Sequence, residues 1–282
     1  MQAGACIRLD VLTTGFVSAA CEAARLGPAS VVIAGVGGDD AALRLALSTT
    51  SPPGPAGPHP LAAASMIKTP IALGLLDATA RGTLRLDERL RISAEAITEN
   101  DAASPLEAGY ETTLEALARL MIVRSDNVAT NALIDRLGRT RITERLHALG
   151  LRETFVRRKL SGGDVPVHDP GAAGRNAHPP EDAARLFSAI ATDGVPGAAW
   201  LRDSLAAQEW NDKLSAGLRP GDGFAHKTGD TSAASHDGGI LTLPDGRRFV
   251  IVVYTALPAS PEADARLGDF MRRIRPSLDR SG

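Results

Sequence analysis

Short runs of apolar residues mark both ends of the chain. Residues 29–38 (ASVVIAGVGG) and 42–50 (ALRLALSTT) are rich in β-branched residues or alternate between apolar and polar positions, and GGDDA separates them. Runs of this kind, bounded by Gly and Asp, are typical of two strands joined by a hairpin. Three further runs near the C-terminus have the same character, with the turn sequence PDG before the last of them: GFAHKTGD, GGILTL and RRFVIVVYTAL.

The middle of the chain has a helical pattern instead. Each of its apolar-periodic stretches ends on Gly, as helices commonly do. The stretches are SMIKTPIALGLLDATARG, TTLEALARLMIVRSDNVATNALIDRLG, RITERLHALG and PPEDAARLFSAIATDG. The breaker-rich loop SPPGPAGPHP precedes them, and the helical stretch LRDSLAAQEWNDKLSAGL follows them. The last long pattern is an amphipathic helix, PEADARLGDFMRRIRPSL.

This order of elements predicts an α+β fold with two lobes. Strands from the two ends of the chain most economically pair into one antiparallel sheet of five strands, flanked by the first and last helices. The sheet domain is then discontinuous, with residues 1–58 and 205–282, and residues 59–204 form an all-helical domain. We expect the binding site in the cleft between them.

The composition and charge of the chain limit the classes of molecule that it is expected to bind. The chain has 282 residues, of which 44% are hydrophobic, and a net charge of −2 with acidic and basic residues interspersed. This balance offers neither a basic stripe for nucleic acid nor a polybasic cluster for an anionic membrane. A small molecule or peptide is therefore the expected partner, and we expect the protein to be a monomer.

The two cysteines, Cys6 and Cys21, do not form a metal-binding pattern with histidines, so we expect no structural zinc and no cofactor. We favour two free buried thiols, with a disulfide between them as the open alternative. The first residues form a poor signal peptide, because Arg8 and Asp10 interrupt the apolar patch. We expect a cytoplasmic protein as the sequence is written, or a periplasmic or secreted one if a leader has been omitted.

The first candidate for chemistry is Ser65-x-x-Lys68, at the mouth of an apolar helical run. Residues three apart in a helix share one face, so the lysine can approach the serine hydroxyl. A serine becomes a nucleophile when a neighbouring base accepts its proton, and a lysine whose pKa is lowered can be that base. The alternative interpretation is a solvated lysine on a helix start.

Two further motifs carry similar chemistry. Ser125-Asp126-Asn127 offers a hydroxyl that can relay a proton and an amide that can bind a carbonyl, although such residues also form ordinary helix caps. His226-Lys227-Thr228-Gly229 begins the returning strands. A lysine and a hydroxyl on an edge strand can hold a carboxylate, or the lysine can simply deter aggregation: the sequence alone leaves both open.

The three motifs together are more specific than any one of them. S-x-x-K, S-D-N and K-T-G, in this order, resemble the signature set of the class A β-lactamases, which belong to the penicillin-recognising serine acyl transferases. The resemblance extends over nearly the whole chain, and RSDNVATNALIDRLG is especially similar. It implies a five-stranded sheet packed by the terminal helices, beside an all-α lobe, and a serine hydrolase that forms an acyl-enzyme.

The resemblance also implies roles for individual residues. Ser65 attacks the acyl carbonyl, and Lys68 is the candidate base. Ser125 passes the proton to the departing nitrogen, assisted by the charge of Lys227. The backbone N–H groups of Ser65 and Asp230 form the oxyanion hole, in which each such donor lowers the barrier by roughly 2.7–4 kcal/mol.

Substrate binding is implied for the neighbouring residues. Asn127 binds the side-chain amide of the substrate, while Thr228 and Lys227 hold its carboxylate, beside Gly229 on the same strand. A second basic residue is common on the next strand of class A enzymes. Here that place is occupied by Gly238, with His236 nearby.

One catalytic residue of the family has no counterpart. A glutamate on a long loop activates the water that removes the acyl group, with an asparagine four residues later. The loop at residues 151–180 places Leu160 at the glutamate and Asp164 at the asparagine, and RRKLSGGD has no E-x-x-x-N. Asp164, His168 or Asp169 are the candidate replacements, and of these residue types only histidine ordinarily titrates near neutrality.

Three functional hypotheses follow. The leading one is a β-lactamase-like serine hydrolase that is acylated at Ser65 and deacylated slowly or by an unusual route. The second is an esterase or D-alanyl-D-alanine-type peptidase of the same fold, whose smaller acyl group leaves room for water. The third is a non-catalytic domain that binds β-lactams or peptides without covalent capture.

Overall fold

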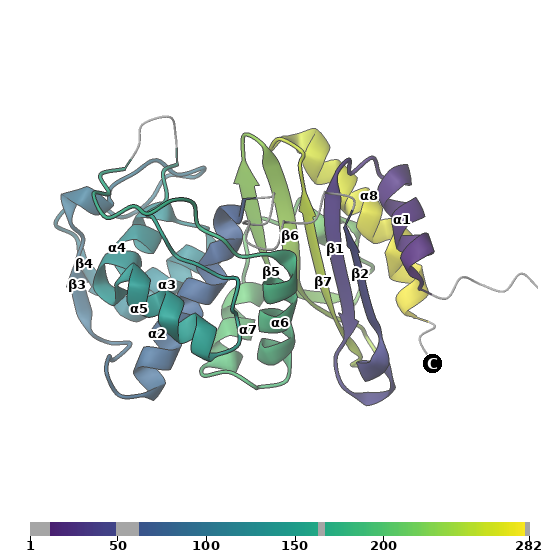
Figure 1. Ribbon diagram of the computed structural model, residues 1–282, viewed down its shortest axis with the longest axis horizontal. Helices are drawn as coiled ribbons and strands as arrows, with labels where there is room; N and C mark the ends of the chain where they lie inside the picture. The colour runs from purple at the N-terminus through teal and green to yellow at the C-terminus, as the bar shows by residue number, and fades with distance from the viewer. Residues whose placement is uncertain (1–11, 49–61, 163–166, 280–282) are drawn as a thin grey trace, which may run out of the picture.

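The computed structural model describes residues 12–48, 62–162 and 167–279, and Figure 1 shows their arrangement. A five-stranded sheet lies in the middle, with the strand order β2-β1-β7-β6-β5 and every neighbouring pair antiparallel. The strands are β1 (Ala29–Gly35), β2 (Arg44–Ser48), β5 (Gly223–Thr231), β6 (Ala234–Thr242) and β7 (Arg248–Thr255). The predicted sheet is therefore confirmed.

The two faces of the sheet bury different cores. Side chains alternate between faces along a strand, so Val31 and Ile251 point to one side and Val32 and Val252 to the other. The first side packs against α1 (Thr14–Ala23) and α8 (Pro261–Leu278), as Figure 1 shows, and the second side faces the remaining helices. The apolar runs from both ends of the chain thus lie side by side in one sheet, and both faces of that sheet are buried.

The remaining helices form the second lobe and cover the other face of the sheet. They are α2 (Lys68–Ala80), α3 (Leu114–Val123), α4 (Asn127–Leu137), α5 (Arg139–Ala148), α6 (Pro180–Ala191) and α7 (Ala198–Ala206). α2 is buried on all sides and contacts α3, α4, α5 and α7, which explains why it is apolar all round. α6 packs against β1, β6 and β7. The division of the chain at residues 58 and 204 stays a prediction.

The structure differs from the predicted helical block in three places. A two-stranded sheet of β3 (Arg89–Arg91) and β4 (Glu111–Thr113) makes the lobe not purely helical. The long run at 112–138 is two helices, α3 and α4. The helix predicted over 201–218 ends at Ala206. Beyond it the side chain of Gln208 donates to the Ile122 carbonyl and accepts from the Trp210 amide, and these contacts hold the backbone in a non-helical path.

None of the helices in the described ranges is long and apolar enough to cross a bilayer. Cys21 is buried in α1. Cys6 and Asp164 lie outside the described residues, so the expectations that involve them stay predictions.

Candidate active site

Ser65 and Lys68 meet where a short 3₁₀ turn (Ala64–Ile67) runs into α2. Lys68 Nζ donates a hydrogen bond to Ser65 Oγ at 2.9 Å, and the lysine side chain is fully buried. Ala64, just before the serine, has a φ of 45°, a left-handed conformation that costs a residue with a side chain about 1–3 kcal/mol. The pair is therefore held in a fixed geometry, and the solvated interpretation of Lys68 is wrong.

Ser125 lies at the break between α3 and α4, with a φ of 59°. Asp126 caps α4 by accepting a hydrogen bond from the Ala129 amide at 2.8 Å, so the motif is a helix cap as well as a site. The left-handed turn directs Ser125 Oγ to a point 3.0 Å from the Nζ atoms of both Lys68 and Lys227. The two lysines thus share one hydroxyl.

Asn127 is the first residue of α4, and its Oδ1 accepts a hydrogen bond from Lys68 Nζ at 2.8 Å. Its own Nδ2 donates to the Glu99 carbonyl at 3.1 Å. Because both ends of the amide have protein partners, its orientation is fixed. A substrate amide must therefore bind beside these contacts or replace one of them.

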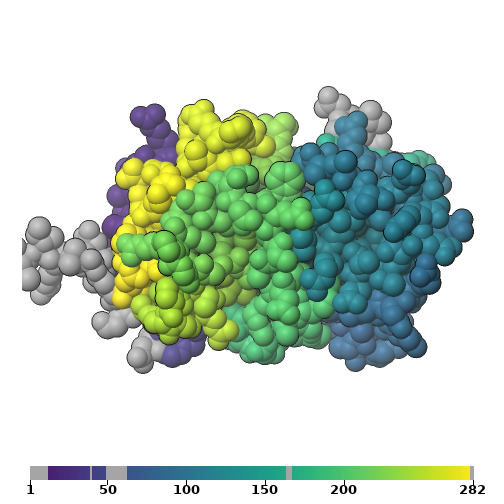
Figure 2. All heavy atoms as spheres, turned by 180° about the vertical axis from the view of Figure 1, so that it is seen from behind, coloured from purple at the N-terminus to yellow at the C-terminus, as the bar shows by residue number. Residues whose placement is uncertain are grey.

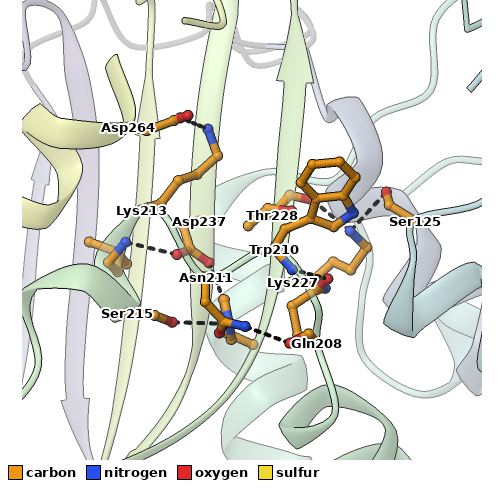
Figure 3. Close-up of polar contacts among 12 residues, drawn as sticks. Ser125, Gln208, Trp210, Asn211, Lys213, Ser215, Lys227, Thr228, Asp237 and Asp264 are labelled. Atoms are coloured by element: carbon orange, nitrogen blue, oxygen red, sulfur yellow. Dashed lines mark hydrogen bonds and ion pairs between the residues drawn. The ribbon is translucent and has the colours of Figure 1, made fainter. Parts of the chain in front are cut away.

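Lys227 and Gly229 lie on β5, next to the turn that carries Ser65. Lys227 is fully buried and also donates to the Thr228 carbonyl at 2.9 Å; Figure 3 shows it reaching Ser125. A Cβ atom at Gly229 would come within 3.1 Å of Ala64 Cβ and the Met66 amide nitrogen. Only glycine allows the 3₁₀ turn to lie this close to β5, which brings the backbone of both segments to the serine.

Burial lowers the pKa of both lysines. Burial, followed by the nearby charge of Lys227, lowers the pKa of Lys68 well below its usual value. Burial lowers the pKa of Lys227 to about 7, although Asp237 and Asp230 favour its charged form. A neutral Lys68 beside a charged Lys227 is therefore accessible near neutral pH, as a base next to a cation requires.

The cleft beside Ser65 has a cavity volume of about 230 Å³. Its walls come from the helical lobe, β5 and the start of α8, which lie side by side in Figure 2 as blue, green and yellow regions. The residues that line it are Ser65, Asp101, Ser125, Trp210, Asp212, Lys213, Thr228, Gly229, Asp230, Ala259, Ser260, Pro261 and Asp264. Sequence reasoning missed Trp210 and Lys213 because it placed both in a helix.

Asn131 is a further residue that sequence reasoning missed. Its side chain holds the backbone of Leu160 at both ends: Oδ1 accepts from the Leu160 amide at 2.8 Å and Nδ2 donates to its carbonyl at 2.9 Å. Asn131 follows Asn127 by four residues on α4, so both lie on one helix face, about one 5.4 Å turn apart. The repeated asparagine at this spacing was the available signal.

Two of the candidate water-activating residues of the loop, His168 and Asp169, are among the described residues, and neither belongs to this cluster. Asp169 forms an ion pair with Arg139 and accepts a hydrogen bond from the Lys159 amide at 2.7 Å. Burial acts to raise the pKa of its carboxyl, but these contacts outweigh burial and lower the pKa. Its carboxylate therefore fixes the loop. His168 is exposed, and neither residue lines the cleft. Leu160 packs its side chain against the core of the helical lobe.

His236 does not supply the second cation of the site. It is fully buried on β6, stacks on Tyr254 at 4.1 Å between ring centroids, and hydrogen-bonds the Ala62 carbonyl at 2.7 Å. Burial lowers its pKa to about 4, so it is neutral near pH 7. Gly238 pairs with Lys227 across the β5–β6 ladder.

Comparisons with known proteins agree with this geometry. A family model described as "Beta-lactamase enzyme family" matches residues 47–275. A β-lactamase of Bacteroides uniformis is 27% identical over 229 residues, a match that covers 74% of this chain and 75% of that protein. The extended-spectrum β-lactamase PER-1 of Pseudomonas aeruginosa is 23% identical over 209 residues, covering 67% and 66% of the two chains.

Solved structures show the same fold. The structure of PBP-A has a TM-score of 0.78 and 25% identity, with 96% of this chain and 99% of that chain covered. A variant of PBP-A, described as an acyl-enzyme complex with penicillin G, has a TM-score of 0.76, 24% identity, and 96% and 99% coverage. The chain therefore belongs to the β-lactamase enzyme family and is a class A β-lactamase-like serine hydrolase, an enzyme type that acts through an acyl-enzyme.

Proposed function

We propose that the protein opens β-lactams by acylation of Ser65 and releases the acyl group slowly. The observation that carries the proposal is the position of Lys68 Nζ, 2.9 Å from Ser65 Oγ and 3.0 Å from Ser125 Oγ. One amine thus touches both hydroxyls that the reaction needs, and burial favours its neutral form.

Acylation then follows from the contacts. Neutral Lys68 accepts the proton of Ser65 as Oγ attacks the lactam carbonyl, and the C–N bond of the tetrahedral intermediate breaks. Ser125 gives its proton to the departing ring nitrogen and regains one from Lys68, which restores the amine. Charged Lys227, 3.0 Å from Ser125 Oγ, stabilises the hydroxyl during the transfer. The Ser65 and Asp230 amides are the proposed oxyanion donors.

Slow release rests on the loop. Hydrolysis of the ester at Ser65 needs a base that activates water, and the resemblance places Leu160 where the family has its glutamate. Asp169 has its carboxylate engaged with Arg139, and His168 lies outside the cleft lining. PBP-A, whose fold this chain shares, has been captured in a leucine-to-glutamate variant as an acyl-enzyme with penicillin G.

Intact-protein mass spectrometry after mixing with penicillin G tests both halves of the proposal. We expect the protein mass to rise by the whole mass of penicillin G, because ring opening loses no atoms, and the adduct to persist after free drug is removed. The Ser65→Ala variant should form no adduct. Rapid return to the free mass would contradict slow release. An intact fold with neither adduct nor turnover would favour the non-catalytic alternative, and fast turnover of a nitrophenyl ester with mere inhibition by penicillin would favour the esterase.

The charge of Lys227 predicts the pH dependence of acylation. Because the pKa of this lysine is about 7, its ammonium form is lost as the pH rises through 7, whereas burial and the charge of Lys227 favour the neutral form of Lys68. We expect the acylation rate constant to fall above pH 7, by about tenfold per pH unit if the neutral form is inactive. The measurement is the rate of adduct formation between pH 5 and pH 9.

The Lys227→Arg variant is the matched control for this profile. Arginine stays charged over the whole range, so whatever rate the variant retains should not fall between pH 7 and pH 9. If the variant and the native protein lose activity at the same pH, a group other than Lys227 controls the alkaline limb.

A further inference from the structure

Lys213 lies in the wall of the cleft, and all three of its N–H groups have acceptors in the protein. They bind Asp230 Oδ1 at 2.9 Å, Ser235 Oγ at 2.6 Å and the carboxylate of Asp264. The lysine side chain is only 6% exposed, and Figure 3 shows it directed at Asp264. Since an ammonium group has three donors, none is left for a substrate.

This cluster carries a net negative charge. Burial disfavours the charged form of Lys213, but the carboxylates of Asp230 and Asp264 outweigh it and raise the pKa of the lysine. One cation against two carboxylates leaves one negative charge on the cluster. Among the cleft-lining residues in the described part of the chain, the other ionisable side chains are also acidic: Asp101 and Asp212.

Asp230 places this charge on β5, the strand that also carries Thr228. It follows Thr228 by two residues on β5, so the two side chains lie on the same face, about 6–7 Å apart along the strand. Both line the cleft with Ser65, and the Asp230 side chain is 32% exposed. A substrate carboxylate held by the Thr228 hydroxyl would meet a second carboxylate well within one screening length.

Resting on the proposed function, we propose that the side chain of Asp230 is a specificity determinant, which favours acyl donors with a neutral or cationic group beside the scissile bond over donors with a carboxylate there. Asp230 disfavours the carboxylate in two ways. It repels the negative charge directly, and it engages Lys213, the cation of the cleft wall that could otherwise bind that charge.

Penicillin G and its methyl ester form a matched pair of probes, because they differ only in the charge of this carboxylate. The readout is the ratio of the two second-order acylation rate constants, followed by intact mass. We expect the native protein to prefer the methyl ester. The Asp230→Asn variant, which keeps the backbone N–H and nearly the same shape, should shift the ratio by about tenfold towards penicillin G.

Two control variants separate local contact from general charge. Asp212→Asn removes the same charge from the cleft wall but leaves Lys213 with its partners, so the ratio should shift far less than in Asp230→Asn. Adding Lys213→Met to Asp230→Asn should reverse most of the shift, because the cluster then keeps only the Asp264 carboxylate and again carries one net negative charge. These ratios are insensitive to losses that affect both probes equally.

The outcomes distinguish this inference from the proposed function. If neither probe forms an adduct with any variant that retains Ser65, the proposed function fails. If both probes acylate Ser65 but the native protein prefers penicillin G, or Asp230→Asn leaves the ratio unchanged, the specificity role of Asp230 is wrong while the acylation chemistry stands. An equal shift in Asp212→Asn would also overturn it, since any cleft charge would then suffice.

Discussion

Replacement of Lys68 by methionine is expected to slow acylation of Ser65 by roughly 10²–10⁴-fold, the usual contribution of a general base. Methionine keeps much of the length and apolar stem of the lysine but cannot accept a proton. In the native protein the amine contacts the hydroxyls of Ser65 and Ser125 and the amide of Asn127, so it is the base placed at Ser65. The measurement is the rate of adduct formation with penicillin G.

The Lys68→Arg variant separates a base from a cation. An arginine stays protonated, so it could supply positive charge to Ser65 and Ser125 but could not accept a proton. We expect it to be as slow as the methionine variant. Acylation within tenfold of the native rate would show that Lys68 acts through its charge. Far-UV and near-UV circular dichroism of both variants checks that the buried site tolerates the exchange.

The second large effect is expected at Leu160, where glutamate should accelerate deacylation by roughly 10²–10⁴-fold. Asn131 holds the backbone of residue 160, and Asn127, one helical turn away on the same face of α4, contacts Lys68. The backbone of residue 160 is thus fixed about one helical turn from a residue that contacts Lys68, and we expect a carboxylate introduced there to reach the water that attacks the ester. The measurement is the rate at which the penicilloyl adduct at Ser65 loses its mass.

Leu160→Gln is the control for this gain. It has the size and polarity of the glutamate variant but cannot accept a proton, so it should leave the adduct as persistent as in the native protein. Because residue 160 is partly buried against the core, the new carboxyl should have a raised pKa, and the acceleration should grow as the pH rises through it. Equal acceleration by Gln would instead indicate a loosened loop that admits water.

Most of the fold could be predicted from local pattern. The runs that form β1 and β7 are apolar almost throughout because both faces of the sheet are covered, and the helix at 68–80 is buried on every side, so the pattern of each segment indicates its burial. The errors arose where side chains compete with the backbone. Gln208 and Asn211 bond nearby carbonyls, and these contacts end a helix that the periodicity alone extends to residue 218.

The sequence by itself determined which chemistry this protein carries: Ser65, Lys68, Ser125 and Lys227 are recognisable because their residue types and spacing suit an acyl transfer. Only the tertiary structure decided which protonation state each lysine of the site favours. The pKa of Lys68 is lowered because it is buried beside Lys227, and the pKa of Lys213 is raised because carboxylates from β5 and α8 contact it. Desolvation and charge pairing depend on residues that are distant in the chain and meet only in the folded protein, so a local motif does not predict them.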